Sequence, residues 1–254
     1  MSSIVFFRRI FTSKEYWLSV LATVVLLMSS IVYKVTGEEY TFWTLFYDDT
    51  AQHALKTGVI SINKIILGYD SGYLWMFCPI IVGIPFVILN RTERFLLFRM
   101  GKNRYVFAKS FSSIIAGGLT IVIAYLIYAI LGTILTTIFS HENIWNLLLL
   151  KKMLSVLMWG VFNSISCMVL SEFIRNKYLI LCIPFVLNYV VNMFMSSILP
   201  YSITKYTNPY HYQSLFLLEK ETWLPCLGIL IALITVCFVL KKTVFERRCD
   251  CGQQ

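Results

Sequence analysis

The chain has 254 residues, of which 58% are hydrophobic and 14% are charged, and its mean hydropathy is +0.72. Soluble domains carry about 25% charged residues, so this composition excludes an ordinary water-soluble domain and indicates several membrane spans. The formal net charge is +9, but the basic residues occur in short segments between apolar runs, which argues against a nucleic-acid partner.

The first element is a short segment in which apolar and basic residues alternate. Apolar residues between Ile4 and Phe11 surround Arg8 and Arg9, and Lys14 follows them. This pattern predicts an amphipathic amino-terminal helix in the cytoplasmic interface, with its cations towards anionic membrane lipids. The alternative is a frayed basic tail.

Six apolar stretches follow, and crossing the hydrocarbon core of a membrane takes about 20 such residues. They run from Tyr16 to Tyr33, Ser71 to Asn90, Ser110 to Ser140, Met153 to Ser171, Tyr178 to Thr204 and Thr222 to Leu240. No soluble domain interrupts them. We therefore expect an all-α integral membrane protein with six transmembrane helices in a single domain, residues 1–254.

The distribution of Lys and Arg predicts the orientation of these spans. Seven of the 22 cations lie on one side and none of them is arginine; they are Lys34, Lys56, Lys64, Lys151, Lys152, Lys205 and Lys220. The other 15 lie on the side of both termini. Cytoplasmic loops are enriched in Lys and Arg, so both termini are predicted to be cytoplasmic.

The predicted outer segment from Lys34 to Asp70 is the longest piece outside the membrane, and it carries five acidic residues against three lysines. It is too short for an independent soluble domain. Its role is left open by the sequence.

Catalytic motifs are absent from the sequence. It contains no H-E-x-x-H, no G-x-S-x-G and no G-x-x-x-x-G-K-[ST], so we expect no enzyme activity, no cofactor and no ATP hydrolysis by the chain alone. Cys249 and Cys251 in the polar tail would supply only half of a metal site, so no metal is predicted.

Small and polar residues inside the spans are interpreted as packing elements. Gly117, Gly118 and Gly132 would let neighbouring helices approach the third span closely. Asn188 and Asn192 share a face of the fifth span, where their amides would bond to another helix or line a polar path.

The predicted cytoplasmic loop between the second and third spans, Asn90 to Lys109, combines six cations and one acid with an apolar patch. A simple connection needs no such patch, so we predict a short amphipathic helix that docks on a partner or lies on lipid. Its residues include Arg94, Phe95, Leu97, Phe98, Arg99, Gly101, Lys102 and Arg104.

At this loop the sequence resembles the permease subunits of bacterial ABC-2 type transporters. The resemblance is carried by the helix with Pro79 and Pro85, the pair Glu93 and Arg94 at its end, and Arg99-x-Gly101-x-x-Arg104-x-x-x-x-Lys109 before a glycine-bearing helix. It implies a multi-pass protein of the bacterial cytoplasmic membrane that pairs with a second permease copy or a paralogue. It also implies a separate ATP-binding subunit that contacts this loop as a coupling helix, and short re-entrant helices within Leu199 to Glu221.

The expected function is therefore that of a permease subunit of an ATP-driven transporter, exporting a peptide, lipid-like or antibiotic-like substrate. The alternative is a stand-alone membrane immunity or sensor protein without transport activity. The long acidic outer segment departs from the short first loop usual in the family, which leaves a role related to the substrate open.

We expect a reporter fused after Gln254 to face the cytoplasm, because the basic residues gather on the side of both termini. Paired alkaline phosphatase and fluorescent protein fusions would measure this, and phosphatase activity from the fusion would contradict the six-span topology.

Overall fold

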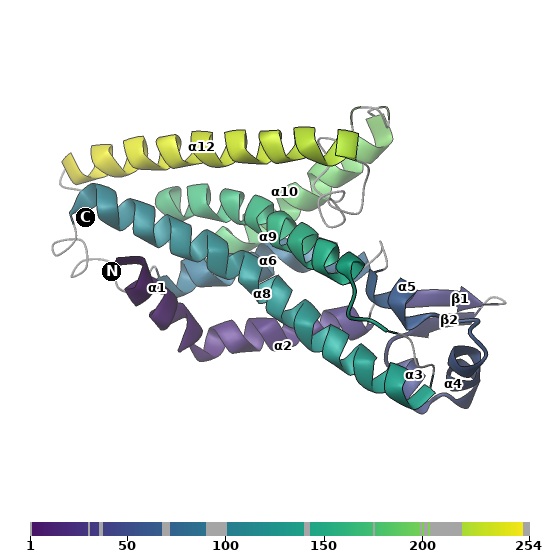
Figure 1. Cartoon of the computed structure of the whole chain (residues 1–254). Coiled ribbons are helices and arrows are strands. Elements are labelled where there is room, and N and C mark those ends of the chain that lie inside the picture. The colour runs from purple at the N-terminus through teal and green to yellow at the C-terminus, as the bar shows by residue number, and fades with distance from the viewer. Residues whose placement is uncertain are drawn as a thin grey trace.

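The computed structural model describes residues 2–29, 31–35, 38–67, 72–89, 101–139, 143–174, 176–198, 200, 203 and 220–250. The fold of this part is almost entirely helical (Figure 1). Its elements are α1 (Ser2–Phe11), α2 (Lys14–Ser29), β1 (Ile31–Val35), β2 (Glu38–Thr41), α3 (Thr44–Tyr47), α4 (Asp49–Lys56), α5 (Ile62–Leu67), α6 (Gly72–Leu89), α8 (Lys102–Phe139), α9 (Leu147–Phe173), α10 (Lys177–Ile198) and α12 (Lys220–Asp250).

The chain is a helical membrane protein by the length and apolarity of its helices. Three of the described helices are long and apolar enough to cross a membrane, at Asn103–Phe139, Leu147–Ser171 and Leu224–Val244. The pair α1 and α2, bent by 63°, meets the same criterion when taken as one unit. Shorter apolar segments, Phe77–Leu89 and Lys177–Val190, lie in α6 and α10.

Several predicted span boundaries differ from the structure. The α9 helix begins at Leu147, before the predicted Met153, and α12 continues to Asp250, beyond the predicted Leu240. The first span was expected to remain helical to Tyr33, but α2 ends at Ser29 and β1 pairs with β2 in an antiparallel ladder. Ile31, Val32, Tyr33 and Val35 are β-branched or aromatic residues, which favour strands over helices. The third span was expected to begin at Ser110, whereas α8 begins at Lys102, so part of the predicted loop belongs to this helix.

The α8 and α9 helices make the most extensive contact in the molecule, and glycine makes it possible. A Cβ atom added at Gly160 would lie 2.8 Å from the Cα atom of Gly118, and one at Gly117 would lie 2.7 Å from the Ser164 Oγ atom. Such distances leave no room for a side chain. The predicted close approach at Gly117 and Gly118 is confirmed, as it is at Gly132, where a Cβ atom would collide with Ile66.

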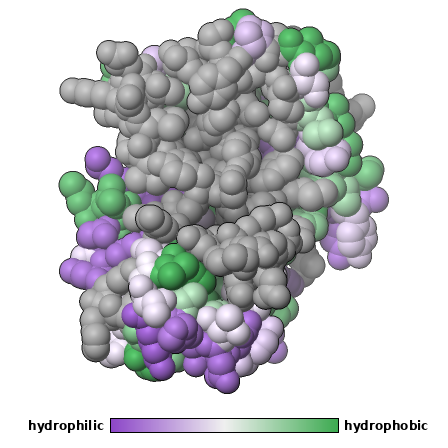
Figure 2. Space-filling model, turned by 90° about the vertical axis from the view of Figure 1, so that its right-hand side faces the viewer, coloured by the Kyte–Doolittle hydropathy of each residue, from purple (hydrophilic) through white to green (hydrophobic). Residues whose placement is uncertain are grey.

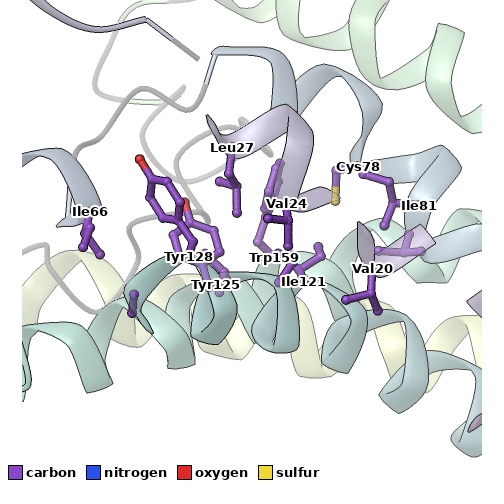
Figure 3. Close-up of a cluster of buried hydrophobic side chains, with 14 of the residues drawn as sticks. Val20, Val24, Leu27, Ile66, Cys78, Ile81, Ile121, Tyr125, Tyr128 and Trp159 are labelled. Carbon is purple, nitrogen blue, oxygen red and sulfur yellow. The ribbon is translucent and has the colours of Figure 1, made fainter. Parts of the chain in front are cut away.

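The main hydrophobic core lies around this contact and is formed by α2, α6, α8 and α9 (Figure 3). In α2, Val20, Val24 and Leu27 recur at helical spacing and are buried, so one stripe of the helix faces the bundle. They gather near Trp159 of α9, which is 1% exposed and among the largest fully buried side chains. The opposite stripe of α2 is exposed, as expected for a lipid-facing surface.

A compact unit, residues 38–67, covers one end of the bundle and is called the cap here. It contains β2, α3, α4 and α5 and lies around the last turns of α8 (Figure 1). Phe42 is fully buried and its ring centroid lies 4.5 Å from that of Tyr128. Asn63 donates a side-chain hydrogen bond to the Asn143 carbonyl oxygen at 3.1 Å. The described part of the segment between α2 and α6 is therefore a folded unit attached to α8.

Replacing Gly160 by alanine should lower the free energy of unfolding by about 1–3 kcal/mol, because the added methyl group meets backbone atoms of α8. Unfolding of the detergent-solubilised protein would measure the effect. Gly228→Ala is the matched control, since a Cβ atom at Gly228 in α12 meets nothing within 4 Å. Equal stability of the two variants would contradict the close contact of α8 with α9.

Candidate functional site

The candidate site lies at the end of the bundle opposite the cap, where α1 and the start of α8 meet (Figure 1). Its first component is α1, an amphipathic helix as predicted. Phe6 and Ile10 are four residues apart and buried at 2% and 0% exposure. Ile4, Val5 and Arg8 are exposed, so the outer face combines apolar side chains with a cation. Such a face suits the headgroup layer of a membrane.

Two contacts fix α1 on the first turns of α8. The Phe6 ring packs edge-on against Tyr105, with centroids 5.7 Å apart. The Ser112 hydroxyl donates a hydrogen bond to the Ser3 carbonyl oxygen at 3.3 Å. Within α8, the Lys109 ammonium lies 5.9 Å from the centroid of the same Tyr105 ring, a cation–π distance. These contacts bury Tyr105 and make α1 and α8 one unit at this end.

The 63° bend between α1 and α2 is also held by hydrogen bonds. The Thr12 amide and hydroxyl both donate to the Arg8 carbonyl oxygen, at 3.0 and 2.9 Å, which closes the last turn of α1. The Trp17 indole nitrogen donates to the Phe11 carbonyl oxygen at 2.9 Å across the bend. The Trp17 bond thus ties the first turn of α2 to the end of α1 across the bend.

The structure places only part of the predicted coupling loop. Arg94, Phe95, Leu97, Phe98 and Arg99 lie outside the described residues, and their predicted docking role stays a prediction.

The described end of that loop is a turn into α8. Gly101 has a φ of +75°, a left-handed conformation that favours glycine, and its carbonyl oxygen accepts a hydrogen bond from the Tyr105 amide at 3.0 Å. Lys102 begins α8. Arg104 is exposed and directly precedes Tyr105, the residue that packs against α1. The residues that follow the loop are thus the ones on which α1 packs.

The burial of three lysines was not predicted from the sequence, where Lys152 and Lys241 served only as topology signals and Lys109 also as part of the loop motif. Lys109, Lys152 and Lys241 are 3%, 0% and 2% exposed. The Lys152 ammonium lies 5.9 Å from the Tyr125 ring centroid, between α9 and α8. Burying an ammonium group in a membrane bundle is costly, so such positions mark structural or functional constraints. Tyr105 lies four residues before Lys109 in the same helix, so a contact between these two side chains could have been found from the sequence. The Lys152 contact joins two helices and has no such local signal.

The two asparagines of the predicted polar face lie on α10. Asn188 is half-buried, and the side chain of Asn192 lies outside the described part. Whether they form a path or an interhelical bond stays a prediction. Cys251 is likewise outside it, and among the described residues no three His, Cys, Asp or Glu side chains gather in a way that could hold a metal ion.

Comparison of the chain with known proteins gives no match among protein-family models, curated proteins or solved structures.

Replacing Phe6 by alanine should release α1 from α8, because it removes a buried ring worth about 3 kcal/mol. Limited trypsin digestion after Arg8 and Arg9 would measure the release, and cleavage should become at least about tenfold faster if it requires undocking. Ile4→Ala is the matched control, since Ile4 is 67% exposed on the same helix. Equal cleavage of the two variants would contradict docking through Phe6.

Proposed function

We propose that the protein is the membrane-spanning permease subunit of an ATP-driven exporter, energised by a separate ATP-binding subunit. Its substrate class is a peptide, lipid-like or antibiotic-like molecule. The proposal includes a six-span topology with both termini in the cytoplasm, in the cytoplasmic membrane of a bacterium, and pairing with a second permease copy or a paralogue.

The arrangement of the long helices supports this topology. The α2, α6, α8, α9, α10 and α12 helices each have 16 or more residues. The α1 helix and the carboxyl-terminal end of α12 lie at the same end of the bundle, as an even number of crossings requires (Figure 1). The excess of Lys and Arg on the side of the termini supports the proposal that this end is cytoplasmic and that the cap is outside.

The observation that carries the transport proposal is the docking of α1 on the first turns of α8, directly after the basic loop. An ATP-binding subunit that contacts the loop would act on the start of α8, which is clamped to an interfacial helix. The 38 residues of α8 give it a length of about 57 Å, enough to reach from this end to the cap. A movement of the loop would thus be transmitted along α8 to the cap at the other end of the bundle.

Phe98→Ala should reduce co-purification of the ATP-binding subunit more than Lys102→Ala. An apolar anchor in a pocket is worth about 2 kcal/mol, whereas charges at the rim of an interface mainly affect the association rate. Pull-down from membranes that contain both subunits would measure the difference, after insertion of each variant has been verified.

Retention of the ATP-binding subunit by both variants would remove the loop as the coupling element. If no ATP-binding protein accompanies the wild-type chain from its native membrane, the transporter proposal fails and a stand-alone immunity or sensor protein takes its place.

A further inference from the structure

The cap presents three exposed aromatic rings on one side of its shortest helix. Trp43, Phe46 and Tyr47 are 43%, 40% and 73% exposed. Their spacing of three and four residues places them on the same face of the turn around α3. Phe42 and Leu45, in the same stretch, are buried in the cap. Trp43, Phe46 and Tyr47 together are called the aromatic face.

The aromatic face is held in place by the cap's own contacts. The Phe46 ring packs edge-on against buried Phe42, with centroids 5.7 Å apart. The Gln52 side-chain amide donates a hydrogen bond to the Phe46 carbonyl oxygen at 3.2 Å. Phe42 in turn packs against Tyr128 of α8. The rings therefore need little ordering on binding, and such preorganisation favours affinity.

Two carboxylates directly follow these rings in the chain. Asp48 accepts a hydrogen bond from the Thr50 amide at 2.9 Å, which caps α4, and Asp49 is exposed in the first turn. Lys56, at the other end of α4, lies with its ammonium 5.6 Å from the Phe139 ring centroid and so is directed towards α8. The surface beside the aromatic face is consequently acidic, on a chain whose formal net charge is +9.

The position of the aromatic face favours a ligand from the aqueous side over the lipid headgroups. The α3 and α4 helices lie at the far end of the molecule, level with the last turn of α8 (Figure 1). Figure 2 views this end and shows hydrophobic and hydrophilic side chains next to one another in its lower half. Acidic side chains beside the rings would be repelled by anionic lipids, which favour Lys and Arg.

We propose that the aromatic face, together with Asp48 and Asp49, binds a cationic amphipathic peptide. The rings would take up its apolar side chains and hold Lys or Arg by cation–π contact, and the carboxylates would pair with further cations. Binding of such a peptide is a property of the cap alone. The further step, that this peptide is the exported substrate, rests on the proposed function.

The test uses the full chain in nanodiscs of zwitterionic phosphatidylcholine and a fluorescein-labelled amphipathic peptide of Lys and Leu. Fluorescence anisotropy should show saturable binding that weakens as salt increases, above the level found with empty nanodiscs. The same peptide with Glu at every Lys position should not bind. Equal binding to filled and empty nanodiscs, or equal binding of both peptides, would overturn the proposal.

Substitutions locate the binding surface. The double variant W43A/Y47A should raise the Kd about tenfold or more, and Asp49→Asn should raise it roughly threefold and flatten its salt dependence. Trp145→Ala is the matched control, because Trp145 is 50% exposed at the same end but lies outside the cap; its Kd should equal that of the wild type.

Equal loss of binding in the Trp145 variant and the double variant would assign the rings to the headgroup layer and overturn the proposal. Unchanged binding in the double variant would also overturn it. Intact peptide binding by a chain that never recruits an ATP-binding subunit would contradict the transporter proposal and leave the peptide surface standing. The two proposals therefore fail separately.

Discussion

The closeness of α8 and α9 is the constraint on which the rest of the structure depends. Their backbones meet where Gly160 faces Gly118, and lipid tails supply no hydrophobic drive for helices to associate, so tight packing must supply the attraction. The α2 and α6 helices then pack on this pair and complete the core. Because α8 carries α1 at one end and the cap at the other, both peripheral units depend on the same contact.

Local patterns account for the parts of the fold that the sequence predicted. The mixture of apolar residues with Arg8 and Arg9 between Ile4 and Phe11 was enough to predict α1, and the glycines of the third span were enough to predict close packing there. The folded cap was not predicted, because its attachment uses contacts between distant parts of the chain. The Asn63 bond to Asn143, for example, joins residues 80 positions apart, and no local periodicity encodes such a pair.

The same distinction applies to the candidate site. Its position at the start of α8 was predictable from the unusual mixture of cations and apolar residues in the preceding loop. The burial of Lys152 was not, since a pair of lysines at the end of an apolar run has the same pattern whether it faces headgroups or a neighbouring helix. Its tyrosine partner belongs to α8, and only the packing of the two helices brings them together.

Proline divides the long helices into two mechanical groups. The α6, α10 and α12 helices contain Pro79 and Pro85, Pro184, and Pro225 respectively, whereas α2, α8 and α9 contain none. Each internal proline removes one backbone hydrogen bond, which makes a helix easier to bend at that level. The proline-free group is therefore the stiff half of the bundle and the proline group is the compliant half. A change of shape that leaves α8 straight would be absorbed by bending in α6, α10 and α12.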